Sequence, residues 1–330
     1  MTFPSKDGPN SYVWNLKQVY NARLGDNWPS PAARGFFGGG YNPAKSNVIQ
    51  YVQMTSSGNT VDFGDLTQAR GTNGSAVAST TRGIFQGGNA GPGTPYSNVI
   101  DYITISSVGN AADFGDLTVG RRSGIGGGNN STRGLAAGGY NGGGINVIDY
   151  VTMATVGNST DFGDLSAGKF RLGSTSNNTR ALFFGGSTPG AQNAGIVYIT
   201  IATTGNSSVF GDLTNSNRQS AGVASTTRAC RMGGFTDTPS TELNTIDYVT
   251  IATTGNATDF GDLTVGRSYL AGINNSVKGL AAGGRSAPGV YSNIIDYVTI
   301  ASAGNAADFG DLLSTQYGIA GSSNANAGVQ

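Results

Sequence analysis

IDYVTIATTGNATDFGDLTVGR, residues Ile246–Arg267, is the stretch that decides the fold. Its first part is rich in β-branched and aromatic residues, which favour a β-strand. The pair Gly255-Asn256 then fits a two-residue hairpin turn, because both residue types accept the positive φ angles that such turns require. The segment that ends in Phe-Gly-Asp-Leu predicts a second strand returning beside the first. No 3.6-residue apolar period, which would indicate a helix, runs through this stretch.

The same arrangement recurs along the chain at intervals of 48 to 51 residues. A Gly-Asn pair and a tyrosine in the preceding apolar run accompany each copy, and a glycine pair lies earlier still. A period of about 20–50 residues indicates a solenoid, a propeller or another repeat array. Four short strands in each copy match one blade of a β-propeller. The six Phe-Gly-Asp-Leu motifs begin at Phe63, Phe114, Phe162, Phe210, Phe260 and Phe309.

The two ends of the repeat region predict a closed ring. The first copy begins at Arg34 with RGFFGGG, which corresponds to the second strand of a unit, so its innermost strand is missing. After Leu312, the segment STQYGIAGSSN resembles the innermost strand SGIGGGNNS of another copy. We therefore expect an all-β fold, a six-bladed β-propeller with four antiparallel strands per blade. The C-terminal strand is expected to join the first blade, which removes two free sheet edges.

The repeats divide the chain into three parts. Residues 34–323 form the predicted propeller, and residues 324–330 form a C-terminal tail. Residues 1–33 lie outside the repeats and contain both tryptophans. Apolar residues with helical spacing predict a short helix there, in an N-terminal segment that anchors or caps the propeller. Because aromatic residues often anchor interfaces, the candidate partner-docking residues are Trp14, Leu16, Tyr20 and Trp28.

Composition limits the chemistry that the chain can perform. It has no histidine, one cysteine, and 19 basic and 19 acidic residues. Without histidine there is no imidazole for acid–base catalysis, for a Ser-His-Asp triad or for a metal site. A neutral, charge-poor chain shows no basic footprint for nucleic acid, and no run is long and apolar enough for membrane insertion. We expect a non-enzymatic protein with no catalytic residues, no cofactor and no metal.

Two features that resemble reactive sites have structural interpretations. Cys230 aligns with leucines of other copies at a buried strand position, which indicates a small core residue and not a nucleophile. The repeated acids, such as Asp101, Asp113 and Asp116, suggest calcium, but calcium needs six to eight converging oxygens. Calcium binding is therefore the alternative to structural ion pairs. The expected partners of these acids are the repeated basic residues Arg82, Arg133, Arg180, Arg228 and Lys278.

The order of glycine pair, polar loop, strand with tyrosine, turn, aromatic strand and terminal arginine resembles the kelch repeat over about residues 34–323. The tryptophan that is typical of the last kelch strand is absent, and phenylalanines such as Phe63 and Phe114 stand in its place. The amino-acid sequence of Ile246–Arg267 is similar to sequences in repeat proteins of tailed bacteriophages of aquatic bacteria. That resemblance implies a structural protein of the virion.

Blade topology predicts two unlike faces. The turns that join strands one and two, and strands three and four, share one face and have similar sequences; we call it the uniform face. The loops after the glycine pairs lie on the opposite face and vary in length and sequence; we call it the variable-loop face. Aromatic residues on such loops are candidate recognition residues, although loops also vary where nothing constrains them. The candidates are Tyr41, Tyr96, Tyr140, Phe235 and Tyr291.

These expectations lead to one functional hypothesis and one alternative. The N-terminal segment is expected to emerge on the uniform face, beside the C-terminus, and to dock there on other virion structural proteins. The protein would then be a tail or fibre component, or a capsid-attached decoration, made in the host cytoplasm and located in the virion. The alternative is a receptor- or glycan-binding adhesin module whose variable loops recognise a host surface glycan or receptor.

Overall fold

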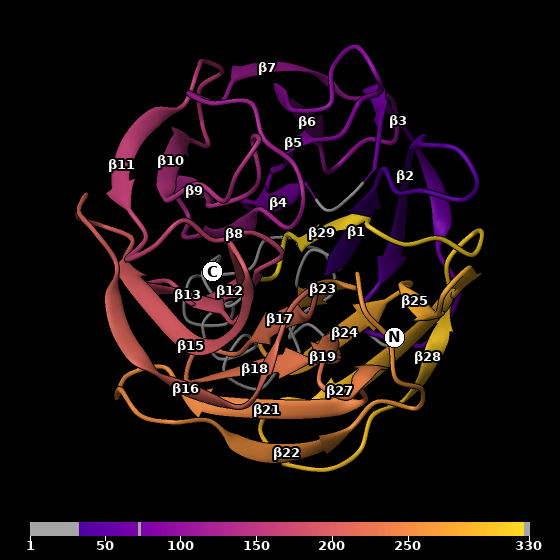
Figure 1. Ribbon diagram of the computed structural model, residues 1–330. Coiled ribbons are helices and arrows are strands. Elements are labelled where there is room, and N and C mark those ends of the chain that lie inside the picture. Colours follow the sequence, from indigo (N-terminus) through magenta and orange to yellow (C-terminus); the bar gives the residue numbers. More distant parts are fainter. Residues whose placement is uncertain (1–32, 72–73, 327–330) are drawn as a thin grey trace, which may run out of the picture.

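The computed structural model describes residues 33–71 and 74–326. Six antiparallel sheets stand around a central axis, and each sheet has its innermost strand at the centre and its fourth strand at the rim (Figure 1). Within the described ranges every regular element is a strand. The prediction of a six-bladed β-propeller with four-stranded blades is therefore confirmed.

The first three blades keep the predicted order of strands, from the centre outward. Blade 1 consists of β29 (Ala320–Ser323), β1 (Arg34–Gly38), β2 (Ser46–Gln53) and β3 (Val61–Arg70). Blade 2 consists of β4 (Ser75–Ala78), β5 (Arg82–Gly88), β6 (Ser97–Thr104) and β7 (Ala112–Asp116). Blade 3 consists of β8 (Gly126–Asn129), β9 (Arg133–Ala137), β10 (Val147–Thr152) and β11 (Thr160–Asp164).

The last three blades add a short hairpin in the variable loop. Blade 4 consists of β12 (Gly173–Ser176), β13 (Arg180–Phe184), β15 (Ala191–Thr200) and β16 (Ser208–Asn217), with β14 (Ser187–Thr188) paired to β15. Blade 5 consists of β17 (Ala221–Ala224), β18 (Arg228–Met232), β21 (Thr245–Thr250) and β22 (Thr258–Asp262), with the hairpin β19 (Phe235–Asp237) and β20 (Ser240–Glu242). Blade 6 consists of β23 (Ala271–Asn274), β24 (Lys278–Ala282), β27 (Ile294–Thr299) and β28 (Ala307–Asp311), with the hairpin β25 (Arg285–Ala287) and β26 (Val290–Tyr291).

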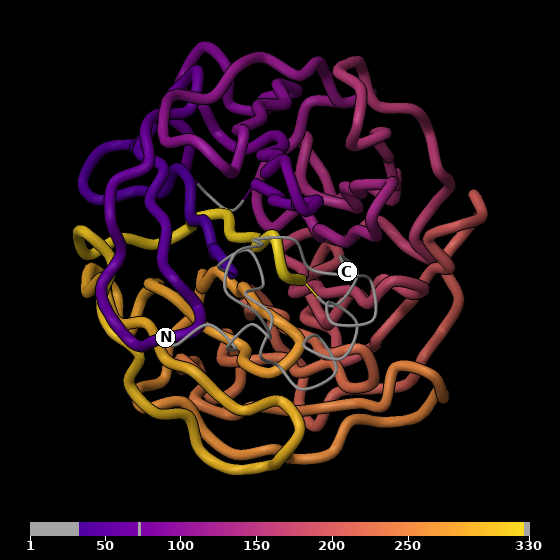
Figure 2. Tube along the Cα trace, turned by 180° about the vertical axis from the view of Figure 1, so that it is seen from behind, coloured from indigo at the N-terminus to yellow at the C-terminus, as the bar shows by residue number. Residues whose placement is uncertain are grey.

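The ring closes where the two ends of the repeat region meet. β29 pairs antiparallel with β1, from Gly38 opposite Ala320 to Gly35 opposite Ser323. In Figure 2 this C-terminal strand, in yellow, lies beside the indigo start of the propeller. The backbone N–H of Arg34 also donates to Asn324 Oδ1 at 2.8 Å. The predicted completion of the first blade by the C-terminal strand is confirmed.

Each blade contains the same stack of side chains. The phenylalanine of Phe-Gly-Asp-Leu is buried, and the repeated tyrosine contacts it edge-on at 5.8 to 6.0 Å between ring centroids. A basic residue at the start of the second strand lies over the tyrosine ring at 4.3 to 5.1 Å. Such cation–π contacts stabilise the positive charge of a basic side chain without an acidic partner. The stacking residues are Arg34, Arg82, Arg133, Arg180, Arg228 and Lys278.

The prediction that these basic residues pair with the repeated acids is therefore wrong. The stacked arginines donate to backbone carbonyls of the next blade instead, as Arg82 Nη1 does to the Met153 oxygen at 3.1 Å. Asp101 pairs with Arg70, Asp149 with Arg121 and Asp296 with Arg267, and all of these side chains are buried. Each of these pairs joins the end of one blade to the third strand of the next. Repeat spacing within one copy does not reveal such a contact between copies.

The buried ion pair is replaced where one of its partners is missing. Asn217 stands at the arginine position before blade 5, and there Asp247 pairs with Arg231 of its own blade. Where blade 6 meets blade 1, both positions are neutral, with Gln316 and Gln50, and Gln50 Oε1 accepts from Thr60 Oγ1 at 2.6 Å. Before blade 4 only the acid is lost: Val197 stands at the acid position, and the buried Lys169 Nζ donates to Asn193 Oδ1 at 3.2 Å instead. A buried charge without a partner is costly, and at each of these boundaries the remaining polar group has another hydrogen-bond partner.

The Gly-Asn pairs do not form two-residue hairpin turns as predicted. The Gly157 N–H donates to the Phe114 oxygen at 2.8 Å, and Asn158 Oδ1 accepts from the Asp116 N–H at 3.0 Å. The pair therefore leaves its own hairpin and docks on the fourth strand of the preceding blade. We call this contact the blade latch. It joins Phe63 to Gly109, Phe114 to Gly157, Phe162 to Gly205, Phe210 to Gly255, Phe260 to Gly304 and, across the closure, Phe309 to Gly58.

Candidate functional site

The chain enters and leaves the described propeller on the uniform face. In blade 2 the turn between strands one and two is held by Ser79 Oγ, which accepts from the Arg82 N–H at 3.0 Å. In blade 1, Asn324 takes the place of that turn residue and accepts from the Arg34 N–H. Residues 33 and 324 thus stand where a turn would connect them. The predicted partner-docking residues Trp14, Leu16, Tyr20 and Trp28 lie outside the described residues.

The variable-loop face carries a second set of contacts between blades. A residue in the connection that follows each fourth strand forms a β-bridge with the residue that follows the glycine pair of the next blade. One example is Arg122 with Tyr140, whose backbones exchange hydrogen bonds of 3.1 and 2.8 Å. This ring of bridges brings side chains from neighbouring blades together. The six bridges are Gly71–Asn89, Arg122–Tyr140, Phe170–Ser187, Arg218–Phe235, Ser268–Arg285 and Tyr317–Tyr41.

The five predicted recognition aromatics are half-buried, and the structure divides them into three groups. Tyr96 and Tyr140 contact each other with ring centroids 6.1 Å apart. Tyr41 and Tyr291 both contact Tyr317, with ring centroids 5.5 and 4.8 Å away from the Tyr317 ring centroid. Phe235 lies between arginines. Recognition by these residues remains a prediction, because their positions alone do not show what they bind.

Sequence reasoning missed the residues that link these groups. Tyr269 contacts Tyr317 at 5.2 Å, and Phe170 contacts Tyr140 at 5.3 Å. Each missed residue lies in a connection between a fourth strand and the next first strand. Only their place in the repeat could have indicated them, because residues at the same repeat position as Arg122 contact the variable loop of the next blade. We call the whole set the aromatic–arginine belt; it consists of Tyr41, Tyr96, Arg122, Tyr140, Phe170, Arg171, Arg218, Phe235, Tyr269, Arg285, Tyr291 and Tyr317.

Arginines lie over the aromatic rings of the belt. The Arg122 guanidinium is 5.3 Å from the Tyr96 centroid and 5.8 Å from the Tyr140 centroid. Arg171 lies 5.2 Å over Phe170, and Arg218 lies 5.0 Å over Phe235. The aromatic faces hold the long arginine side chains in fixed positions. Their charges are therefore presented to solvent in a defined arrangement.

Two of the belt arginines have acidic partners. Arg218 pairs with Asp237 at 2.8 Å, and Arg285 pairs with Glu242 at 2.9 Å. Arg122 and Arg171 form no salt bridge with any described residue. Burial lowers the pKa of Arg218, and repulsion from nearby Arg171 lowers it further, while Asp237 raises it. Positive charge is therefore concentrated on this part of the face.

The inner edge of the belt has a strained backbone. Arg171, Gln219 and Tyr269 have φ angles of +61°, +62° and +58°. They form a hydrogen-bonded chain, in which the Gln219 N–H donates to the Arg171 oxygen and the Tyr269 N–H donates to the Gln219 oxygen, both at 2.8 Å. Non-glycine residues adopt this conformation only where the surroundings impose it, and such residues cluster at functional sites. The same repeat position is Ser123, with φ +65°, and Gly318, with φ +68°, so this conformation belongs to the connection between blades.

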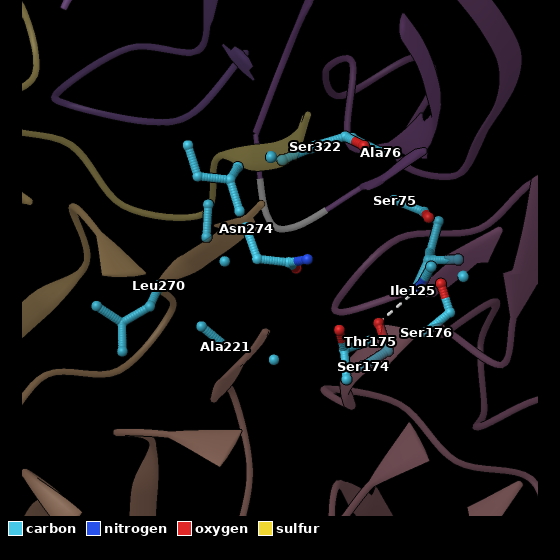
Figure 3. Close-up of a pocket in the computed structure, with 18 of the residues that line it drawn as sticks. Ser75, Ala76, Ile125, Ser174, Thr175, Ser176, Ala221, Leu270, Asn274 and Ser322 are labelled. Atoms are coloured by element: carbon cyan, nitrogen blue, oxygen red, sulfur yellow. Dashed lines mark hydrogen bonds between the residues drawn. The ribbon is translucent and has the colours of Figure 1, made fainter. Parts of the chain in front are cut away.

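The central channel itself offers little chemistry. It holds a cavity of about 80 Å³, lined by glycines, by small or amide side chains such as Ser75 and Asn274, and by aliphatic side chains such as Ile125 and Leu270 (Figure 3). Asn326 Nδ2 donates to Asn129 Oδ1 at 3.0 Å, and Asn274 Nδ2 donates to Asn326 Oδ1 at 3.3 Å. This amide bridge crosses the channel. Among the described lining residues, none carries an ionisable side chain.

Other reactive groups are isolated. Cys230 is fully buried opposite Tyr248 in the sheet, as its alignment with leucines predicted, and burial raises the pKa of its thiol to about 12. Over residues 33–71 and 74–326, no three cysteine or acidic side chains gather as a metal site would require. In the same ranges, no helix has the length and apolar character of a membrane span.

Comparison with protein-family models gave no match, and comparison with curated proteins gave none either. The six-bladed propeller therefore rests on the strand order and on the ring closure described above.

Proposed function

We propose that this protein is a non-enzymatic structural protein of a tailed-phage particle. It docks on other virion structural proteins through its N-terminal segment and displays its variable loops. One observation carries the proposal: Arg34 and Asn324, where the chain enters and leaves the described propeller, lie together on the uniform face. Attachment through that face leaves the variable-loop face free. The resemblance of the repeat sequences to the kelch repeat and to repeat proteins of tailed bacteriophages supports the same assignment.

The construction of the ring suits a display role. Six blade latches, the buried pairs between blades and the ring of bridges on the opposite face make every blade depend on its neighbours. Such a scaffold holds loops of different sequence in fixed positions, as many binding proteins require. The uncharged channel gives no support to a catalytic role. A tail or fibre component and a capsid-attached decoration both fit this design.

Quantitative mass spectrometry of purified particles tests the assignment. The virus that encodes this chain is grown, its particles are purified by density gradient, and the copy number of the protein is measured against the major capsid protein. We expect a fixed, reproducible number of copies per particle. Absence of the protein from purified particles, with presence in the infected-cell lysate, would overturn the proposal.

Docking through the N-terminal segment has its own test. Particles are made with the double variant Trp14→Ala, Trp28→Ala in the full chain, because tryptophans are frequent anchors of interfaces. We expect the variant protein to be made but lost from the particles. The matched control is Val290→Ala, an exposed residue on the variable-loop face, which should be incorporated normally. Equal incorporation of both proteins would exclude docking through the two tryptophans.

The aromatic–arginine belt favours a second candidate function, that of a receptor- or glycan-binding adhesin module. Arg122 between Tyr96 and Tyr140 is a preformed group of the kind that dominates binding interfaces. This function is compatible with a place in the virion, since a displayed face is also a face that can bind. The two candidates differ in whether the loops contact a ligand.

A further inference from the structure

We propose that the aromatic–arginine belt binds an acidic polysaccharide, with sugar carboxylate or sulfate groups held by Arg122 and Arg171. The proposal rests on the display of the variable-loop face in the proposed function, and it names the ligand class of the adhesin alternative.

Charge distribution is the first support for an anionic ligand. The chain as a whole is neutral, with 19 basic and 19 acidic residues. The variable loops and the connections between fourth and first strands contain two acids, Asp237 and Glu242, and both are already paired with belt arginines. Arg122 and Arg171 remain without an acidic partner among the described residues. A negatively charged group is the missing complement at these two positions.

The arginines are held in a way that suits planar anions. Arg122 is fixed by two aromatic rings and by the backbone bridge between its own residue and Tyr140. No described residue accepts a hydrogen bond from the side chains of Arg122 or Arg171, and the Arg122 Nε is buried without a partner. A guanidinium binds a carboxylate or a sulfate through two parallel hydrogen bonds. Because the side chains are already ordered, little conformational entropy is lost on binding.

The aromatic part of the belt points to a saccharide and not to a simple anion. Tyr96, Tyr140 and Phe170 form a continuous group beside the two free arginines. The apolar C–H face of a sugar ring packs on an aromatic ring, and tyrosine adds a hydroxyl that can donate or accept a hydrogen bond. Alternating aromatic and cationic groups thus match a chain in which sugar rings alternate with acidic groups.

Nucleic acid fits the same face less well. A protein that binds nucleic acid neutralises several phosphates with a stripe of basic residues. Here the cations are few, and Arg218 and Arg285 are occupied by acids. Single-stranded DNA is nevertheless a polyanion with stackable bases, so it serves as the competing probe.

Binding of the purified full-length protein to four polymers tests the inference. The probes are polygalacturonate for carboxylates, dextran sulfate for sulfates, neutral dextran, and single-stranded DNA, each measured by isothermal titration calorimetry. We expect binding to polygalacturonate or dextran sulfate that weakens with added salt, and no binding to neutral dextran. Which acidic polymer binds identifies the acidic group. The inference is overturned if neither acidic polymer binds, if neutral dextran binds equally well, or if DNA binds more tightly than both.

Variants separate a built site from general attraction between charges. Arg122→Gln with Arg171→Gln should weaken acidic-polymer binding at least about tenfold, since each removes a charged hydrogen bond. The control Lys278→Gln removes one charge from the uniform face and is compared with Arg171→Gln alone, which removes one charge from the belt. Arg122→Lys keeps the charge but loses the planar fork, so it should also weaken binding. Full binding by Arg122→Lys, or equal loss in Lys278→Gln, would contradict a specific site.

Folding and function are kept apart in this design. Arg171→Gln alone provides a second reading if the double variant is unstable, because the Arg171 side chain donates no hydrogen bond to a described residue. Presence in the particle without polysaccharide binding would remove this inference and leave the structural role intact. Binding by a protein absent from particles would do the reverse.

Discussion

At the residue scale, the buried ion pairs show how a residue at one repeat position contacts a residue at another repeat position in the next blade. Arg267 Nη2 lies 2.6 Å from Asp296 Oδ2, and both side chains are buried. Burial alone would lower the pKa of the Arg267 guanidinium, and Asp296 opposes that shift. The same two repeat positions carry Gln50 and Gln316 where the ring closes. The protein therefore contains both a charged and a neutral version of one contact.

Removing one partner of this pair should be costly. We expect Asp296→Asn to lower the free energy of unfolding by about 3 kcal/mol, because it leaves the Arg267 charge buried and unpaired. The double variant Asp296→Gln, Arg267→Gln reproduces the neutral version and should recover most of that loss. Urea denaturation, followed by far-UV circular dichroism, measures the free energy of unfolding of both variants. A double variant less stable than Asp296→Asn would show that the charged pair is itself required.

The Cys230 thiol should be inert in the native protein. Because burial raises its pKa to about 12, the thiolate is scarce at pH 8 and a thiol reagent should react only after unfolding in urea. The folded pKa lies above the unfolded one, so this group stabilises the fold fully below about pH 9. That contribution declines by up to about 1.4 kcal/mol per pH unit as the pH rises toward 12. Rapid labelling of the native protein at pH 8 would disprove burial.

At the element scale, the blade latch explains why two short motifs recur together. The Gly-Asn pair of one blade hydrogen-bonds to the Phe-Gly-Asp segment of the preceding blade, six times around the ring. The glycine between Phe and Asp is required by this close approach. A Cβ on Gly211 would lie 2.2 Å from the Gly255 carbonyl oxygen, whereas a Cβ on Gly255 would meet no atom within 4 Å.

These two glycines form a matched pair for one experiment. Neither has a φ angle that strains an L-residue, so the two alanine variants differ in space alone. We expect Gly211→Ala to lower the free energy of unfolding by about 1–3 kcal/mol through overpacking. Gly255→Ala should stay within about 0.5 kcal/mol of the parent protein. Equal effects in thermal unfolding would mean that the latch does not depend on close approach.

The latch also shows where sequence reasoning stops. Strand order within a blade was predictable, because Phe-Gly-Asp-Leu and the tyrosine register set the phase of each copy. The partners of Asn158 and Asp101 were not, because these residues bond to a neighbouring copy and repeats look alike in every copy. The same reason hid Arg122 and Tyr317 from the candidate site. A residue's neighbour across a blade boundary is a property of the ring.

At the scale of the whole molecule, closure depends on four residues far along the chain. β29, Ala320–Ser323, completes blade 1, and Asn324 and Asn326 add contacts to Arg34 and across the channel. Closure was predictable, since the first repeat lacks its inner strand and STQYGIAGSSN supplies one. Without β29, both β1 and the last blade would present exposed surface at the break.

Truncation tests the importance of closure. A chain that ends at Leu313 lacks β29 and should lose cooperative unfolding and form aggregates, because the open ring exposes unpaired strand edges. A chain that ends at Asn326 keeps every described contact and should remain a monodisperse species. Size-exclusion chromatography with light scattering, followed by urea denaturation, compares the two. A stable, monodisperse protein ending at Leu313 would show that the latches alone maintain the ring.

The position of β29 has a consequence for synthesis of the protein. Ribosomes make β1 before every other strand and β29 after all six outer strands, yet the two must lie side by side. A nascent chain therefore stays an open arc until translation has passed Ser323. Any product that stops earlier keeps an unfinished first blade, which proteases and chaperones of the cell can distinguish from the closed ring.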